Sequence, residues 1–94
     1  MGALLSNSTG VKNTANGAFA LFSNISGDYN TATGVEALSS NTFGNDKTAT
    51  GTETLELNTE GFGNTADGNS ALVENTTGSS NTANGFGALF NMTL

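Results

Sequence analysis

Small and apolar residues recur along this chain at one fixed interval. Glycine returns every 17 residues, and in most units alanine and leucine follow it three and four positions later. A second glycine column lies ten positions after the first, with asparagine and threonine around it. No insertion breaks the register, so units begin at Gly17, Gly34, Gly51, Gly68 and Gly85.

A 17-residue period predicts an all-β fold, a β-solenoid of 17-residue coils. Helical repeats need units of about 33 residues or more, because two helices and two turns must fit in each. The two glycine columns predict two turns per unit, and the segments between them are about five residues long, a length that suits a strand. Each strand would pair in parallel with its copy one coil away, about 4.8 Å along the axis. Residues 1–94 are therefore expected to form a single repeat array with partial units at both ends.

Identical residues of successive units are expected to stack into rows along the solenoid. The leucine column predicts a buried core row, which consists of Leu4, Leu21, Leu38, Leu55, Leu72 and Leu89. Stacked asparagine amides can hydrogen-bond to their own copies one coil away. The asparagine column is therefore predicted to form a structural ladder, which consists of Asn7, Asn24, Asn41, Asn58 and Asn75.

Alanine and leucine are adjacent in the repeat, and adjacent residues of a strand point to opposite faces. If leucine fills the interior, the alanines and the residues after each leucine face outward as an apolar stripe, which is typical of an oligomer interface. The predicted chain-to-chain contact consists of Ala20, Phe22, Ala37, Ala71, Val73, Ala88 and Phe90. A partly wet surface with scattered apolar residues is the alternative, and Glu56 in the middle of the stripe favours it.

The two ends of the sequence lack the atypical polar coils that usually cap a solenoid. The array is therefore expected to be a segment of a longer fibre, or to stack end to end on another copy of the chain. The first of these is the favoured interpretation.

Several units resemble the repeats of trimeric fibre proteins. Residues 13–17, 30–34 and 81–85 carry the pattern Asn-Thr-Ala-x-Gly, and residues 71–78 read Ala-Leu-Val-Glu-Asn-Thr-Thr-Gly. These patterns are similar to the YadA-like head repeats of trimeric autotransporter adhesins and to repeats of phage tail fibres, although the unit here is longer than the usual head unit.

The resemblance implies a left-handed parallel β-roll, assembly as a parallel homotrimer, and a role as a rigid spacer or adhesive head. It does not identify a receptor. Lys47 and Thr54 depart from the family pattern, which has asparagine and alanine at these positions, and both are expected to be absorbed locally.

Composition restricts the chemistry. The chain of 94 residues has no cysteine and no histidine, which excludes disulfides, thiolate metal sites and imidazole catalysis. Eight acidic residues against two lysines give a formal net charge of −6, which argues against nucleic acids and anionic membranes as partners. No apolar run is long enough to insert into a membrane. The carboxylates are spread over several columns without a basic partner, so neither an enzymatic activity nor a cofactor is predicted.

Glu36 and Glu53 share a column one coil apart, and two neighbouring carboxylates can hold a weakly bound Ca²⁺ ion. The Gly-Gly-x-Gly-x-Asp repeat of calcium-binding β-rolls is missing. Solvated repulsion between the two carboxylates is therefore the favoured interpretation, and no metal site is predicted.

Four Asn-x-Ser/Thr sequons occur, at Asn7, Asn24, Asn75 and Asn91. Such sequons accept glycans in secreted proteins. Three of them belong to the ladder column, and we interpret them as by-products of the repeat.

A threonine row offers a binding function as the alternative to a purely structural one. The row is unbroken and consists of Thr14, Thr31, Thr48, Thr65 and Thr82. Thr33 and Thr50 stand two residues further along the same strand face, which resembles the Thr-x-Thr arrays of ice-binding proteins. Only two of the five rungs are complete, however, and Asp67 places a charge on this face. The same row is also the candidate surface for a receptor or a glycan.

The predicted function is that of a structural fibre segment, either a rigid spacer or an adhesive head. Its expected location is extracellular, at a cell or virion surface. Its expected partners are further copies of the chain in a homotrimer and an unknown surface receptor or glycan.

Overall fold

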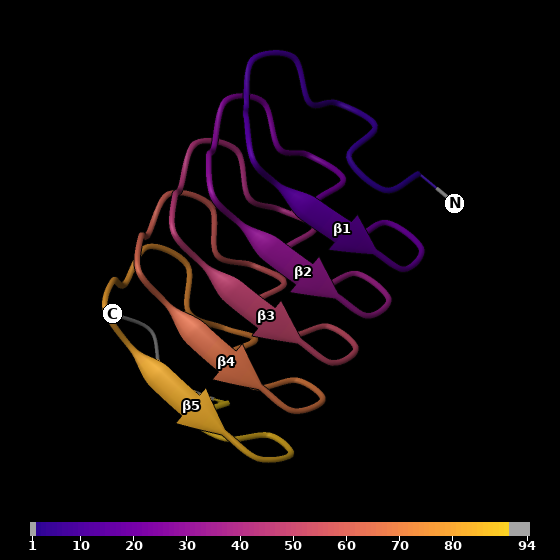
Figure 1. Ribbon diagram of the computed structural model, residues 1–94. Helices are drawn as coiled ribbons and strands as arrows, with labels where there is room; N and C mark the ends of the chain where they lie inside the picture. Colours follow the sequence, from indigo (N-terminus) through magenta and orange to yellow (C-terminus); the bar gives the residue numbers. More distant parts are fainter. Residues whose placement is uncertain (1, 91–94) are drawn as a thin grey trace.

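The computed structural model describes residues 2–90 as an all-β solenoid (Figure 1). Its five strands belong to one parallel sheet, in the order β1-β2-β3-β4-β5. Every strand has three residues and begins with the same Thr-Ala pair of the repeat. The strands are β1 (Thr14–Asn16), β2 (Thr31–Thr33), β3 (Thr48–Thr50), β4 (Thr65–Asp67) and β5 (Thr82–Asn84). The predicted all-β solenoid with 17-residue coils is confirmed.

Neighbouring strands pair in the register that the period predicts. Thr31 lies opposite Thr14 on one side and Thr48 on the other, so each residue meets its own copy in the next coil. Successive side chains of a strand point to opposite faces. In β3 the central alanine is buried and both threonines are exposed. The sheet therefore contributes an alanine row to the core and a threonine row to the surface.

Each coil contains one strand rather than the two that were predicted. The Ala-Leu segment forms a series of turns, and in residues 17–24 three amides each donate a 3.2 Å hydrogen bond to the carbonyl three residues earlier. Phe19 and Leu21 adopt positive φ values of 62° and 50° in these turns. The amide of Leu21 also donates to the carbonyl oxygen of Ala37 at 3.0 Å. The segment therefore bonds to the next coil without being a strand.

These turns bury alanine and leucine together. Ala20, Ala37 and Ala71 are fully buried beside the leucines. The prediction that the alanine row faces outward is wrong, because side chains alternate only along an extended backbone and the leucines have positive φ.

The other residues of the predicted chain-to-chain contact differ in exposure. Val73 is buried, and Ala88 packs partly against the core. Phe22 is half-buried and Phe90 is exposed. Only the two phenylalanines therefore remain available at the surface.

The predicted leucine row is confirmed over the middle of the solenoid. Four of its members are 0% exposed, namely Leu21, Leu38, Leu55 and Leu72. Leu4 is half-buried and packs against this core. Leu89, in the last described coil, is 49% exposed.

Thr54 occupies a position of the alanine row and is fully buried. Its Oγ1 donates to the carbonyl oxygen of Gly68 at 2.7 Å. The hydroxyl is therefore satisfied inside the core, and this departure from the repeat is absorbed locally.

The second glycine column lets successive coils pack backbone against backbone. A Cβ atom on Gly27 would lie 2.4 Å from the carbonyl oxygen of Gly44. That distance is far below any normal contact, so glycine is required at this turn.

The asparagine ladder forms as predicted in the first coils. Asn24 Nδ2 donates to Asn7 Oδ1 at 2.7 Å, and Asn41 Nδ2 donates to Asn24 Oδ1 at 2.8 Å. Each amide also donates to the glycine carbonyl three residues ahead in its own coil, for example Asn24 to Gly27 at 3.0 Å. The ladder thus joins one coil to the next and closes the turn within each coil.

Candidate functional site

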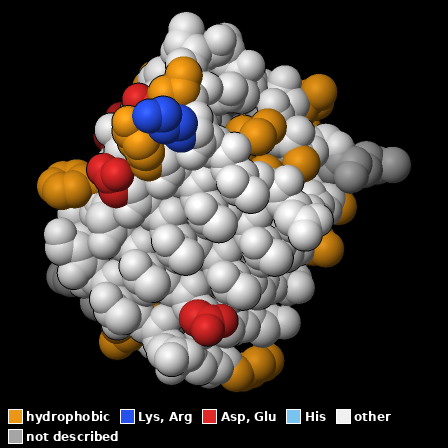
Figure 2. Space-filling view, in the orientation of Figure 1, with side chains coloured by type: hydrophobic (Ala, Val, Ile, Leu, Met, Phe, Trp, Pro, Cys, Tyr) orange, Lys and Arg blue, Asp and Glu red, His pale blue; other side chains and the backbone are white. Residues whose placement is uncertain are grey.

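The outward side chains of the five strands form a regular polar surface, which we call the threonine face. Parallel pairing in constant register aligns the first residues of the strands in one row. All five predicted threonines of this row are exposed, namely Thr14, Thr31, Thr48, Thr65 and Thr82. In the same orientation as the ribbon, hydrophobic side chains gather towards the margins of the molecule and its middle is mostly uncharged (Figure 2).

The second row of the threonine face is less regular. It contains threonine only in β2 and β3, so complete Thr-x-Thr rungs occur at these two strands. Asp67 ends β4 with an exposed carboxylate, and asparagine ends β1 and β5. The face therefore offers hydroxyl and amide groups in repeating order, interrupted by one charge.

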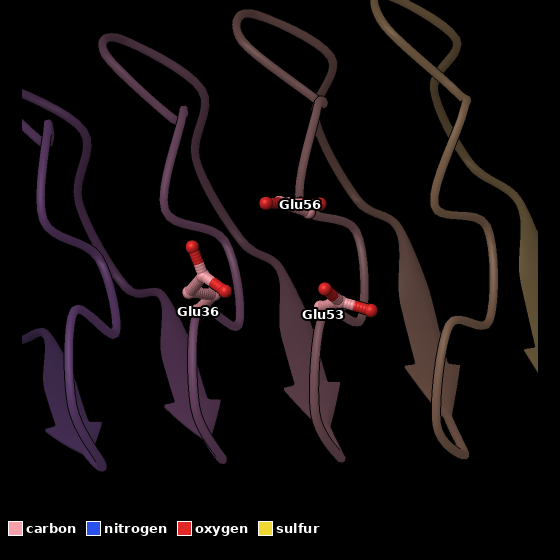
Figure 3. A group of neighbouring side chains, drawn as sticks. All are labelled: Glu36, Glu53 and Glu56. Carbon is pink, nitrogen blue, oxygen red and sulfur yellow. The ribbon is translucent and has the colours of Figure 1, made fainter.

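Glu36, Glu53 and Glu56 form a compact carboxylate cluster on another side of the solenoid (Figure 3). One carboxylate oxygen from each residue lies within 4.8 Å of the others, and all three residues are half-buried. Glu36 and Glu53 occupy matching positions of neighbouring coils, where the amide of Glu53 donates to the Val35 carbonyl at 2.8 Å. Glu56 lies one turn further along the coil of Glu53, and its amide donates to the Glu53 carbonyl at 3.3 Å.

The electrostatics of this cluster oppose full ionisation. Burial raises the pKa of Glu56, and the negative charges of Glu36 and Glu53 raise it further. Two events can relieve the repulsion between the three carboxylates. A hard cation such as Ca²⁺ can bind to their oxygens, or Glu56 can take up a proton. The sequence placed Glu36 and Glu53 together. It did not place Glu56 with them, because Glu56 belongs to a different column.

Exposed hydrophobic side chains lie along two flanks of the solenoid. Those on the turns around the Ala-Leu segment, which we call the Ala-Leu flank, are Leu5, Phe19, Val35, Leu57, Phe86, Leu89 and Phe90, and the half-buried Phe22 lies among them. Those on the segments that lead into the strands are Val11, Ile25, Tyr29, Phe43 and Phe62. On the Ala-Leu flank the rings of Phe19 and Phe22 lie 5.5 Å apart, a normal distance for an aromatic pair.

Three of the four sequons lie in the ladder rather than on the surface. Asn24 and Asn75 are fully buried, and Asn7 is half-buried with its amide bonded to Gly10. Asn91 lies outside the described residues. Burial supports the interpretation that the three ladder sequons are by-products of the repeat.

Lys47 is a residue whose role the sequence did not predict. It occupies a column that otherwise holds asparagine, and its side chain is fully buried. Its Nζ donates to Asn41 Oδ1 at 2.6 Å and to Asn58 Oδ1. The signal in the sequence was a lysine in a column that otherwise holds asparagine, and this signal could have indicated that its side chain hydrogen-bonds inside the solenoid.

Comparison with known proteins gives no family to which the chain can be assigned. No family model, no curated protein and no solved structure matches the sequence or the fold. Within residues 2–90 the structure has no pocket, and it has no helix with the length and apolar character of a membrane span.

Proposed function

We propose that this chain is a structural segment of an extracellular fibre at a cell or virion surface, acting as a rigid spacer or adhesive head. In this proposal three chains, each a left-handed roll, associate in parallel around a common axis. The chain has no catalytic role and needs no cofactor.

The observation that carries the proposal is the unbroken coil register. Five strands pair in parallel without a slip, and the leucine row lies in the interior along the same axis. Each coil pairs with its neighbours in the same strand register, so the array behaves as a rod whose length depends on the number of units. This is the property that a spacer requires.

The Ala-Leu flank is the surface that supports trimer formation best. Phe22 and Phe90, which belong to the contact predicted from the sequence, lie on it with further exposed aromatic and aliphatic residues. The buried alanines and Val73 cannot take part without opening the core. The carboxylate cluster interrupts the flank, so the chain-to-chain contact in this proposal is divided into two apolar parts on either side of it.

Light scattering of the purified chain at micromolar concentration tests this assembly. The expected mass is that of three chains. Changing Phe22 and Phe90 together to Glu is expected to reduce it to one chain, because charged groups cannot be buried at the contact without a partner. The matched control changes Phe43 and Phe62, two exposed phenylalanines outside the Ala-Leu flank, to Glu and should leave the mass unchanged. A monodisperse wild-type monomer would contradict the proposal.

The threonine face supports a second candidate function, a binding surface for a receptor, a glycan or ice. The specific observation is that all five threonines of its first row are exposed and in register. A freezing assay distinguishes ice binding from receptor or glycan binding. Clear thermal hysteresis would favour an ice-binding function over that of a structural fibre segment. A glycan array tests carbohydrate binding, with Thr48→Lys on the face as the variant that should abolish it.

A further inference from the structure

The amide ladder changes direction at Lys47. In Asn7, Asn24 and Asn75 the Oδ1 atom lies close to the glycine three residues ahead in the chain. If that glycine carried a Cβ atom, the Oδ1 would lie 2.5 Å from it for Asn7, 2.6 Å for Asn24 and 2.4 Å for Asn75. In Asn58 the Nδ2 atom takes this place, at 3.0 Å from the corresponding point on Gly61. The Asn58 amide is therefore reversed relative to the other three.

The reversal follows from what a lysine can donate. Lys47 Nζ donates to Asn41 Oδ1, as the next asparagine of the ladder would, and it also donates to Asn58 Oδ1. Because Asn58 Oδ1 points to the lysine, its Nδ2 turns to the following coil and donates to the Asn75 carbonyl at 3.0 Å. The buried amine thus joins the segment before β3 to the segment before β4.

The number of bonds matches a neutral amine. A neutral lysine has two N–H groups, and two amide oxygens accept from Nζ. An ammonium group has three N–H groups and a charge. Both the third N–H and the charge would then be buried, because Lys47 is 0% exposed.

No opposite charge compensates the lysine. The titratable residues on the turns that flank it are Asp28, Tyr29, Asp46 and Glu60, and all four are at least partly exposed. None of them contributes to its protonation, since burial alone lowers the pKa of Lys47 to about 7. The groups packed against Nζ are uncharged amides and the backbone of Gly44.

We propose that Lys47 is a proton-sensitive joint in the solenoid, which ties neighbouring coils together through Asn41 and Asn58 while its amine is neutral and loosens that junction when it takes up a proton. This role belongs to the single chain and holds in a monomer or a trimer. It also explains why a lysine is compatible with a column that otherwise holds asparagine, since its neutral amine joins Asn41 to Asn58 in the adjacent amide ladder without a net charge.

The pH dependence has a definite sign. The unfolded chain keeps the ordinary lysine pKa of 10.5, whereas the folded chain releases the proton near pH 7. Unfolding therefore takes up a proton between these values, and stability rises with pH across this window, by up to about tenfold in the folding equilibrium constant per pH unit. Below pH 7 both states are charged and the full cost of burying the ammonium is present. Above 10.5 both are neutral and the cost disappears.

The test uses the two lysines of the chain as a matched pair. Lys47→Asn restores the residue of the repeat, whose Nδ2 can donate to the Gly61 carbonyl as Asn30 donates to Gly44 at 2.8 Å. Lys12→Asn removes the exposed lysine and serves as the control. Denaturant unfolding followed by circular dichroism from pH 6 to 10.5 gives the stability of all three proteins. For the wild type and Lys12→Asn, the free energy of unfolding is expected to rise strongly with pH. For Lys47→Asn most of this rise should be lost, and this variant should be the most stable of the three near pH 7.

A nuclear magnetic resonance titration of the lysine Cε and Nζ signals checks the wild type directly, without any variant. One of the two lysines is expected to titrate near pH 7, and its signal should be missing from Lys47→Asn. Parallel stability profiles for the wild type and Lys47→Asn, or a Lys47 signal that stays charged up to pH 9, would overturn the proposal.

Discussion

Ala37 and Leu38 are consecutive residues, and the side chains of both are fully buried. A φ of 54° at Leu38 allows this, and its amide bonds to the Thr54 carbonyl of the next coil at 3.0 Å. In the coils of Leu21, Leu38 and Leu72 the core therefore contains an alanine and a leucine from the same turn, together with the alanine of the strand, and Thr54 takes the alanine position beside Leu55.

Leu55→Asp tests the leucine row. The aspartate would place an unpaired charge in the core, and we expect a loss of about 4 kcal/mol of unfolding free energy or failure to fold. Ile25→Asp is the matched control, since Ile25 is an exposed aliphatic residue outside the Ala-Leu flank, and its effect should stay within about 0.5 kcal/mol. Thermal unfolding by circular dichroism measures both. Equal melting temperatures for the two variants would mean that the leucine column is not the core.

Gly27→Ala tests the close approach of successive turns. Its Cβ would lie 2.4 Å from the Gly44 carbonyl oxygen, so the coils must separate, at a cost of about 3 kcal/mol. Gly63→Ala is the control, because its Cβ would meet no atom closer than 3.6 Å and only its φ of 67° opposes the change. That substitution should cost about 1 kcal/mol. A smaller loss for Gly27→Ala than for Gly63→Ala would refute the backbone packing described for this column.

Glu56→Gln is expected to stabilise the protein at neutral pH, by about 2–4 °C in melting temperature, since it removes one charge from a partly solvated cluster. The pKa of Glu56 is raised in the folded chain, so the folded state binds this proton more tightly than the unfolded state. Its contribution to stability is present at low pH and is lost as pH rises above the ordinary value of 4.5. The advantage of Glu56→Gln should therefore grow from pH 4.5 to 7. Glu60→Gln, which removes one negative charge at an exposed residue outside the cluster, is the control.

Removal of divalent cations is expected to leave the melting temperature unchanged, because solvated repulsion is the favoured interpretation of the cluster. A fall of several degrees on adding a chelator, restored by Ca²⁺ and absent in Glu56→Gln, would make Glu36, Glu53 and Glu56 ligands. Unfolding with and without chelator at pH 7.5 decides between these outcomes.

The period of the sequence was sufficient to predict the solenoid, its parallel register and the leucine row. In a solenoid each residue lies next to its own copy in the following coil, so a column of the repeat becomes a row of contacting side chains. The conformation of the Ala-Leu segment was not predictable in this way. Phe19 and Leu21 carry the positive φ values of its turns, and neither residue type indicates a left-handed backbone. The alternation rule for strands therefore gave the wrong face for the alanines.

The candidate site was predictable only in part for a related reason. The sequence predicted that Glu36 and Glu53 lie together, because they share a column of the repeat. Glu56 belongs to another column, and only the turn after Glu53 brings its carboxylate close to the other two. Lys47 was noted as a departure from the repeat. Its link between Asn41 and Asn58 depends on the direction of individual amides, which the pattern of residue types does not contain.

The assembly in parallel, with like coils of the three chains side by side, is tested most directly by the distance between identical residues of different chains. The chain has no cysteine, so Ser39→Cys carries a single spin label beside the Ala-Leu flank. Ser39 is half-buried, at the same repeat position as Phe22 and Phe90. Electron paramagnetic resonance is expected to give one short, well-defined distance between labels, which the change of Phe22 and Phe90 to Glu abolishes. A dipolar signal with no inter-chain component would contradict the trimeric fibre.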